Sequence, residues 1–470
     1  MIWIRQVQRH DNADVVATLA LSLGESPPTG TSRPTLTWIG EDATGRCLGA
    51  AVVRLDEGDR WHLWYLGVIP DAQRKGVGGE LLAIVESAAR DAGVLAVRTR
   101  TYTRWSAMRR LLVNRGWAFV NASLGSYHDG VEEEWVLPVR KKSLAVVLVG
   151  ANPNGRGGEL AGAVKDLEPQ FRLAGVCDTD PNVLSVWRDR VATSRDLEQL
   201  LQHVEAEAAI LALPHSAYRQ ARQICLRHGL GLFHEKPLAC SLGELLELQD
   251  QLTRRPTPLV VGVQRRAHPS YVYLKRALQM DAPHSLEIRL ALGKTHDSRG
   301  VVQKNNDWRS DARVSGGGAI LDLGYHAIDM VHFLTDAPFQ TVSCNLWVGD
   351  RPAAGNELET AATLFGRAGP TWVKVVIDRF GKKSERVRAR GEQIWDADRA
   401  SVRCDGETRF TCPESWGLAL RGQLVNLMLA CSAPASPVSL WDHLTGLRVV
   451  EQARSIARVQ GLDETEADFE

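Results

Sequence analysis

The chain has 470 residues, 44% of them hydrophobic, and its 56 basic residues balance its 56 acidic residues. That length exceeds what one hydrophobic core usually supports, so several domains are expected. The balanced charge creates no overall field that would favour nucleic acid or an anionic membrane, and small-molecule partners are expected instead.

The eight cysteines show no CxxC pair and no zinc-type spacing with histidine, a pattern that argues against a metal centre and against disulfides. No run reaches about 18 apolar residues, and the first residues lack the basic, apolar and small-residue order of a signal peptide. A soluble, cytoplasmic protein without a bound metal is therefore expected.

Residues 1–140 are predicted to form a first α/β domain. Alternating apolar residues indicate strands over residues 2–7, 35–39, 47–55, 61–68, 97–102, 117–123 and 135–139, the last of which should close the sheet. Helical spacing indicates helices from about residue 11, over 80–92 and over 106–114.

A glycine-rich turn lies between the fourth predicted strand and the helix over 80–92. Its sequence is Gln73-Arg74-Lys75-Gly76-Val77-Gly78-Gly79, and a helix that starts here would present unpaired N–H groups to a pyrophosphate. The order of strand, Pro, Gln and two glycines resembles motif A of the GNAT acyltransferase superfamily, over about residues 1–139. The resemblance implies that Val68 and residues 74–79 bind acetyl-CoA or another acyl-CoA, and that the 64–68 strand splays to admit the thioester.

The usual catalytic tyrosine of that family is missing. Family members carry an Asn-xx-Ala-xxx-Tyr helix whose Tyr protonates the leaving thiolate, whereas this chain has Trp105, Met108 and Leu112 at those positions. The candidate substitutes are Tyr102, Tyr65 or Tyr127 as acid and His62 or Glu132 as base. Each of these residues can equally be a packing or surface residue.

Residues 141–264 are predicted to form a doubly wound parallel sheet. Residues 144–149 are continuously apolar, as in a strand buried on both faces. Four further strands, predicted over 171–178, 208–213, 230–234 and 259–264, alternate with helical patterns.

The turn after residue 149 is an imperfect dinucleotide fingerprint, because Asn152 stands between Gly150 and Gly155 where a glycine is usual. Asp178, at the end of the next strand, is placed to accept hydrogen bonds from a ribose, and its charge would repel a 2′-phosphate. NAD is therefore favoured, although NADP is possible. The alternative is that Asp178 only caps the following helix.

From residue 265 the pattern changes to longer strands, over 285–292, 341–348 and 371–380, with one helix over 319–334. Residues 265–462 are predicted to form an α+β substrate-binding and oligomerisation domain with a large mixed sheet, and residues 463–470 an acidic tail.

Four motifs after residue 230 carry a second resemblance: HEKPLA at 234–239, QRR at 264–266, DWR at 307–309 and SGGGAILDLGYHAIDM at 315–330. Together they resemble the Gfo/Idh/MocA oxidoreductases over about residues 143–460. One departure is Tyr218, where that family often has a His after a Pro. The resemblance implies cofactor contacts from Leu213, Pro214, Glu235 and Lys236, substrate contacts from Arg266, Trp308, Arg309 and Tyr325, and a homo-oligomer, either a dimer or a tetramer.

The residues themselves support alcohol oxidation. Hydride removal needs a group to take the hydroxyl proton and another to hold the forming carbonyl oxygen. His326 suits the first role and Lys236 the second. Asp322, four residues before His326 on the predicted helix, should orient the substrate or stabilise the imidazolium, and Asp329 could do likewise.

The leading hypothesis is a bifunctional enzyme of an amino-sugar or secondary-metabolite pathway. It would oxidise or reduce a sugar, nucleotide-sugar or cyclitol and N-acylate an amine. The alternatives are an oxidoreductase with a non-catalytic acyl-CoA-sensing domain and a reductase of an imine or amino acid.

Overall fold

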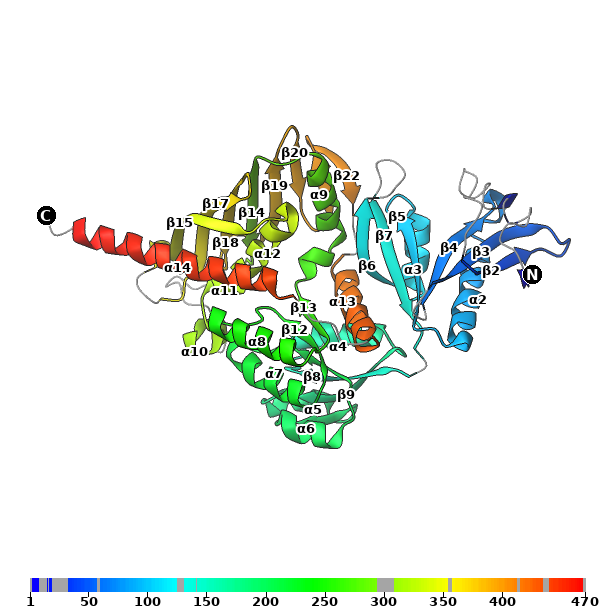
Figure 1. Cartoon of the computed structure of the whole chain (residues 1–470), viewed down its shortest axis with the longest axis horizontal. Helices are drawn as coiled ribbons and strands as arrows, with labels where there is room; N and C mark the ends of the chain where they lie inside the picture. Colours follow the sequence, from blue (N-terminus) through cyan, green and yellow to red (C-terminus); the bar gives the residue numbers. More distant parts are fainter. Residues whose placement is uncertain are drawn as a thin grey trace. The chain divides into compact units, whose positions relative to one another are not determined.

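The computed structural model describes residues 2–7, 15, 17–18, 33–56, 60–124, 131–140, 142–293, 308–353, 357–411, 415–433 and 439–467. The chain divides into two compact units (Figure 1). The first contains residues 1–143 and 166–171, and the second contains residues 144–165 and 172–470. The predicted helix from residue 11 falls largely outside the described residues, as does Tyr127.

The first unit is built on a seven-stranded mixed sheet of order β1-β2-β3-β4-β5-β7-β6. Its strands are β1 (Trp3–Val7), β2 (Thr35–Glu41), β3 (Cys47–Asp56), β4 (Arg60–Val68), β5 (Ala96–Tyr102), β6 (Ala118–Leu124) and β7 (Val131–Pro138). Only β4 and β5 pair in parallel. The prediction that residues 135–139 close the sheet is wrong, because β7 is inserted between β5 and β6 and leaves β6 at the edge.

Two helices of this unit frame its glycine-rich turn: α2 (Val77–Ala92) and α3 (Ser106–Asn114). Leu81, Leu82 and Val85 of α2 are fully buried, as is Leu112 of α3. Leu111 of α3 lies against the start of α2, since a Cβ added to Gly78 would be 3.7 Å from its Cδ2 atom. Both helices therefore lie beside the turn.

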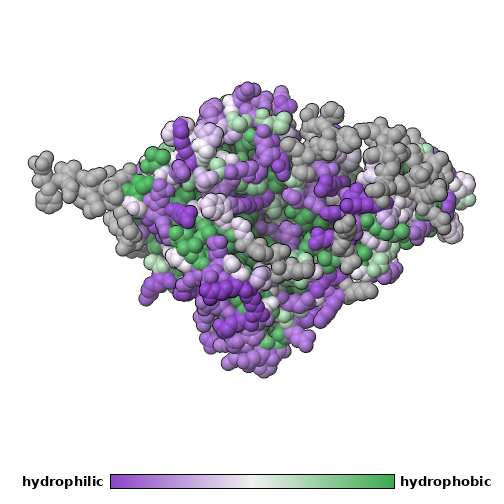
Figure 2. Space-filling view, viewed as in Figure 1, coloured by the Kyte–Doolittle hydropathy of each residue, from purple (hydrophilic) through white to green (hydrophobic). Residues whose placement is uncertain are grey.

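The second unit begins with an all-parallel sheet of order β10-β9-β8-β11-β12-β13, the 3-2-1-4-5-6 order of a dinucleotide-binding fold. Its strands are β8 (Leu144–Val149), β9 (Phe171–Cys177), β10 (Ala192–Ser194), β11 (Ala208–Leu211), β12 (Gly231–Glu235) and β13 (Leu259–Gly262). Its helices are α4 (Arg156–Asp166), α5 (Pro181–Trp187), α6 (Leu197–His203), α7 (Tyr218–Arg227) and α8 (Leu242–Arg254). Figure 2 shows a mainly hydrophilic surface in the region of α6 and α7, as expected for helices whose apolar sides cover a sheet.

The rest of the second unit is a nine-stranded mixed sheet of order β16-β15-β17-β18-β14-β19-β20-β21-β22. Its strands are β14 (Ser285–Ala291), β15 (Phe339–Val348), β16 (Arg351–Pro352), β17 (Ala361–Ala368), β18 (Thr371–Asp378), β19 (Ser384–Arg390), β20 (Ile394–Ala397), β21 (Ser401–Cys404) and β22 (Glu407–Thr411). The longer helices here are α9 (Pro269–Met280), α12 (Gly324–Thr335), α13 (Ser415–Cys431) and α14 (Trp441–Ala467). The predicted α/β fold class, with a parallel sheet followed by a large mixed sheet, is confirmed.

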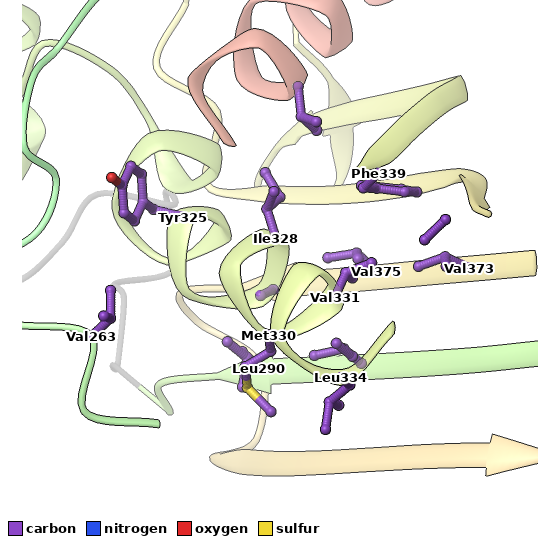
Figure 3. Packing of buried hydrophobic residues seen from close by; sticks show 14 of the residues in the cluster. Val263, Leu290, Tyr325, Ile328, Met330, Val331, Leu334, Phe339, Val373 and Val375 are labelled. Atoms are coloured by element: carbon purple, nitrogen blue, oxygen red, sulfur yellow. The ribbon is translucent and has the colours of Figure 1, made fainter. Parts of the chain in front are cut away.

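Helix α12 supplies the apolar core of this part of the chain. Figure 3 shows Val331 and Leu334 of α12 packed toward Val373 and Val375 of β18. The predicted single helix over 319–334 is divided at Leu323 into α11 (Ala319–Asp322) and α12. The core therefore anchors the helix that follows Asp322 and carries His326. Over the described residues, no helix is long and apolar enough to cross a membrane.

Candidate active sites

The first site lies where β12 ends, at the carboxyl edge of the parallel sheet. The segment after β12 carries Lys236, whose Nζ atom donates to the Oδ1 atom of Asp322 at 2.7 Å and to its backbone oxygen at 2.8 Å. Both side chains are nearly buried, with exposures of 12% and 5%. Two predicted catalytic residues, 86 positions apart, are thus brought into direct contact.

Asp322 is the centre of a set of cations. Its Oδ2 atom accepts from Nε of Arg309 at 2.8 Å, and a nitrogen of Arg379 lies 3.5 Å away. Burial would raise the pKa of the carboxyl, but Lys236, Arg309 and Arg379 lower it well below its usual value. These cations favour the anionic form of Asp322, which pairs with the Lys236 ammonium and opposes the lowering of the lysine pKa by burial.

His326 lies in the first turn of α12, four residues after Asp322. Burial, together with the nearby cations Arg265 and Lys236, lowers its pKa well below the usual value for histidine. The imidazole is neutral at physiological pH and can accept a proton. Asp329, the other carboxylate considered for stabilising the imidazolium, accepts from Nε of Arg266 at 2.9 Å through both oxygens.

A second histidine, which the sequence motifs did not identify, lies in the same cluster. His215 follows Pro214, and its Nδ1 atom is 2.7 Å from the backbone oxygen of Ser315. Its Nε2 atom is 4.0 Å from Oδ1 of Asp322, and its ring contacts Trp308 at a centroid distance of 4.6 Å. Burial and Lys236 lower its pKa to about 4. A histidine directly after the proline at the end of β11 was the available sequence signal.

The glycines before Asp322 have a packing role. Glu359 is buried, and its Oε1 atom accepts from the backbone N–H of Ile320 at 3.0 Å, in place of a side-chain cap from α11 itself. Gly318 lies directly against the Glu359 carboxylate, where any Cβ would collide. Glu359 and Gly318 together fix the helix that ends at Asp322.

The glycine turn after β8 is compact enough for a dinucleotide. Gly150 has φ of +84° and a Cβ there would collide with the backbone of Ala212, so only glycine fits. Asn152 adopts the middle position and organises the turn: its Oδ1 atom accepts from Asn154 N–H, and its backbone oxygen accepts from the N–H groups of Gly155 and Gly158. Helix α4 starts at Arg156, so its positive end faces this turn. These features fit a pyrophosphate.

Asp178 lies at the carboxyl end of β9, beside that turn. Its Oδ2 atom accepts from Ala151 N–H at 2.8 Å, and its Oδ1 atom accepts from Asp180 N–H at 3.0 Å. The alternative that Asp178 caps the next helix is wrong, because Asp180 is the N-cap of α5 and accepts from Asn182 N–H. The rigidly held Asp178 carboxylate remains the candidate for the ribose.

The other predicted cofactor residues line the same sheet edge. Leu213 donates its N–H to the hydroxyl oxygen of Tyr218 at 3.2 Å, so Tyr218 supports the end of β11. Glu235 is buried and accepts from Nε of Arg156 at 2.7 Å and from Nε2 of Gln264 at 2.8 Å. Glu235 therefore links the start of α4 to the segment that carries Lys236.

The predicted substrate residues separate into two pairs. Trp308 and Arg309 lie in the cluster around Asp322, with the Arg309 guanidinium 4.3 Å from the Trp308 ring centroid. The other two have structural partners: Arg266 bridges Asp329 and Asp442, and the buried Tyr325 hydroxyl is 2.8 Å from Nδ1 of His443. Figure 3 shows Tyr325 on a side of α12 turned away from the strands of the sheet.

The second site, in the first unit, begins at the other glycine-rich turn. Gly76 is the N-cap of α2, with φ of +90°, and Gln73, Arg74, Lys75 and Gly76 are all exposed. The N–H of Glu80 is the first that donates within the helix, to Gly76 O at 3.0 Å. The amides of Val77, Gly78 and Gly79 precede it and lack intrahelical acceptors. They form a preorganised anion site.

A fork between two parallel strands adjoins this turn. Strands β4 and β5 pair only from Arg60↔Ala96 to Leu63↔Thr99. Beyond that point, residues 65–68 stay paired with β3 after a bulge at Trp64, while residues 100–102 stay paired with β7. The backbone groups that face the fork are left to a ligand, and Figure 1 shows β4 and β5 diverging. The splayed strand that the resemblance implies is therefore present.

Four of the five substitutes considered for the missing tyrosine lie among the described residues, and none of these four is an obvious acid or base. Tyr102 packs edge-on against Trp105 at 5.3 Å, and Tyr65 packs against Trp64 at 4.8 Å. His62 contacts a guanidinium nitrogen of Arg54 at 3.0 Å, and burial with that cation lowers its pKa to about 4. Glu132 is paired with Arg100 at 3.5 Å. Among the described residues, no group of three or more His, Cys, Asp or Glu side chains could hold a metal ion.

Three family models match the chain. Residues 18–107 match the acetyltransferase (GNAT) family, residues 144–263 match the NAD-binding Rossmann fold of an oxidoreductase family, and residues 283–395 match the GFO/IDH/MocA C-terminal domain. The two glycine turns and the cluster around Asp322 lie in or beside these matched segments.

Individual relatives are more distant. A putative UDP-kanosamine synthase oxidoreductase subunit of Amycolatopsis mediterranei is 30% identical over 131 residues, which are 28% of this chain and 35% of that protein. Two other curated relatives are covered over 42% and 54% of their length, so the chain spans about half or less of these proteins.

Solved structures show the same fold in the second unit. An oxidoreductase from Thermotoga maritima is similar with a TM-score of 0.58 at 16% identity, over 67% of this chain and 97% of that one. UDP-N-acetylglucosamine 3-dehydrogenase from Acidithiobacillus ferrooxidans is similar with a TM-score of 0.54 at 19% identity, over 67% of this chain and 98% of that one.

Replacing Gly318 by alanine should disturb the Asp322 cluster, because the new methyl group would displace the Glu359 carboxylate from Ile320 N–H. We expect a loss of about 1–3 kcal/mol in the free energy of unfolding, as for other overpacked sites. Chemical denaturation measures it. Gly243→Ala is the control, since a Cβ there meets nothing within 4 Å; equal stabilities of the two variants would contradict the assigned contact.

Proposed function

Since this chain joins a GNAT-family domain to the Rossmann and C-terminal domains of a Gfo/Idh/MocA-family oxidoreductase, we propose that it is a bifunctional enzyme. The second unit oxidises or reduces a sugar-type hydroxyl with NAD(P), and the first transfers an acyl group from acyl-CoA to an amine. The observation that carries the oxidoreductase proposal is the buried Lys236–Asp322 pair at the carboxyl edge of the parallel sheet.

In this mechanism Lys236 and His326 divide the work on one hydroxyl. The Lys236 ammonium, held by Asp322 at 2.7 Å, donates to the substrate oxygen and stabilises the negative charge that develops there. The neutral His326 imidazole accepts the hydroxyl proton during oxidation and returns it during reduction. Arg309, itself fixed on Asp322, and Trp308 form the wall against which the substrate lies.

NAD supplies the hydride acceptor when it is bound. The residues that fit it are Gly150, Asn152 and Gly155 at the start of α4, for its pyrophosphate, and Asp178, for its adenosine ribose. Leu213, Pro214 and Glu235 lie along the adjoining strand ends. The negative Asp178 disfavours a 2′-phosphate, which supports NAD over NADP.

The proposed substrate class is a nucleotide-linked amino sugar. The names of the A. mediterranei and A. ferrooxidans relatives refer to nucleotide-linked amino sugars. A cluster of one ammonium, one guanidinium and an indole ring suits a polyhydroxylated ring, since it offers donors to several oxygens and an apolar surface. An amino sugar would also provide the amine for acyl transfer, so both reactions would belong to one pathway.

We also propose a homo-oligomer formed through the mixed sheet of the second unit. Val342, Phe365 and Trp372 on β15, β17 and β18 are exposed to 65%, 40% and 53%. They share the face of the sheet opposite to α12, and a cluster of this kind is usually covered in solution.

Lys236→Ala and His326→Ala should each lower turnover in NADH formation by about 10² to 10⁴, because one removes the donor to the oxygen and the other the proton acceptor. The assay uses NAD with a panel of aldoses and UDP-sugars, including UDP-N-acetylglucosamine. Lys165→Ala, an exposed lysine of α4, is the control. Acetyl-CoA binding should not change in any variant. Near-normal turnover in either active-site variant would remove that residue from the mechanism.

Asp178→Ala should reduce kcat/KM for NAD about tenfold to a hundredfold relative to that for NADP, because a charged hydrogen-bond acceptor of the ribose is lost. Steady-state kinetics with both cofactors measure the ratio. Asp180→Ala removes only the cap of α5 and should leave the ratio unchanged. An unaltered preference in Asp178→Ala would show that the ribose contact is misplaced.

Trp372→Glu should shift the protein toward the monomer, since a charge placed in a buried interface is costly. Sedimentation velocity or light scattering measures the mass. Trp3→Glu, on an exposed tryptophan of β1, should leave the mass unaltered. A wild-type protein that is already monomeric would contradict the proposed interface.

A further inference from the structure

Several buried side-chain atoms of the first unit lack a hydrogen-bond partner among the described residues, and two of them belong to residues that are neighbours across the sheet. These two are the Oγ1 atom of Thr101 and the Oε1 atom of Glu133. Thr101 and Glu133 are directly paired across β5 and β7, so their side chains lie side by side on one face of the sheet. A single buried polar atom without a hydrogen-bond partner has many explanations. Two such atoms on adjacent residues indicate a site that binds another polar group.

That place adjoins the fork between β4 and β5. The last paired residues are Leu63 and Thr99, and Thr99 still donates its hydroxyl to Leu63 O at 2.9 Å. Thr101 is two residues further along β5, on the same face as Thr99, where β4 no longer accompanies the strand. The orphan hydroxyl therefore lies beside the fork, with the Glu133 carboxyl next to it.

The second carboxyl oxygen of Glu133 has two hydrogen-bond partners. Its Oε2 atom accepts from Nε of Arg109 at 2.8 Å and from Nε1 of Trp135 at 3.2 Å. Arg109 belongs to α3, three residues before Leu112, so both lie on the same side of that helix. Glu133 therefore lies on the sheet next to the side of α3 that carries Leu112. The usual catalytic tyrosine would project from the helix at that position.

The environment of Glu133 shifts its carboxyl toward the protonated form. The residue is completely buried. Burial raises its pKa above the usual value, while the Arg109 guanidinium opposes that rise. A protonated carboxyl anchored through one oxygen leaves the other for proton transfer.

We propose that Glu133 is the general acid of acyl transfer, donating a proton from its unanchored oxygen to the thiolate that leaves acyl-CoA. This inference rests on the proposed acyltransferase activity of the first unit. Glu133 would thereby replace the tyrosine that is absent at Leu112. Thr101 is a positioning residue: its hydroxyl lies beside the Glu133 carboxyl, and with acyl-CoA in the fork it donates to the unanchored oxygen and orients it.

The reaction balances without another reagent. The amine nitrogen attacks the thioester carbonyl carbon, a C–N bond forms and the C–S bond breaks. The sulfur takes the proton of Glu133 and leaves as a thiol. The proton lost by the amine nitrogen returns to the Glu133 carboxylate, so the products are an amide and free CoA, and the enzyme is restored.

The test uses the full chain with acetyl-CoA and a panel of amino sugars and simple amines, and it measures amine-dependent release of free thiol. Glu133→Gln keeps the shape and an oxygen for Arg109 but cannot donate an acidic proton. We expect kcat to fall at least about a hundredfold, with KM for acetyl-CoA unchanged. In the wild type kcat should also fall at high pH as Glu133 loses its proton, and this descending limb should be absent from the variant.

Glu134→Gln is the matched control, because Glu134 follows Glu133 on β7 and points to the other face of the strand. It should retain near-normal turnover. Thr101→Val leaves the Arg109 pair intact and provides a second variant if Glu133→Gln does not fold; its kcat should fall about tenfold. Normal kcat in a folded Glu133→Gln, or in Thr101→Val when Glu133→Gln does not fold, would overturn the assignment.

Failure of the underlying activity looks different. Wild-type protein that binds acetyl-CoA, yet releases no thiol with any amine, would overturn both the acyltransferase proposal and the role of Glu133, and would favour an acyl-CoA sensor. Wild-type turnover that survives in Glu133→Gln would overturn the role of Glu133 alone.

Discussion

The second unit depends on one buried ion pair, between Lys236 and Asp322. Removing two charges from water costs several kcal/mol per ion, and a single contact rarely repays that cost. Here Arg309 and Arg379 add further attraction to the Asp322 carboxylate. The pair joins the segment after β12 to the residue just before α12, the helix that carries His326. It therefore fixes where the Lys236 ammonium lies relative to that helix.

The first unit uses unsatisfied groups rather than a satisfied pair. The amides at the start of α2 and the strand edges beyond Leu63 and Thr99 are polar and lack partners within the helix or between the two strands. Such groups are costly unless a ligand or water completes them. The second unit thus holds the polar groups of its candidate site by internal contacts, whereas the first unit leaves polar backbone groups without partners within the helix or between the two strands.

Polar residues of similar appearance in the sequence have opposite roles in the structure. Arg266 belongs to the QRR motif and Arg309 to the DWR motif. Arg309 pairs with Asp322. Arg266 is instead neutralised by Asp329 and Asp442. Glu132 and Glu133 are neighbours, but alternation along a strand exposes one to Arg100 and buries the other. Residue type predicts that a charge will be paired, and only the fold chooses the partner.

The sequence by itself determined the two glycine turns, the strand and helix order around them and the fold class, because local spacing and strand-end placement are short-range properties. It also grouped Lys236 with Asp322, but through the resemblance of two motifs to one family, since the residues are 86 positions apart. It did not identify His215, Glu359 or Glu133, nor that β7 lies between β5 and β6. Those features depend on contacts between residues far apart in the chain. Tertiary packing decided them, since burial and hydrogen-bond partners exist only after the strands and helices have assembled.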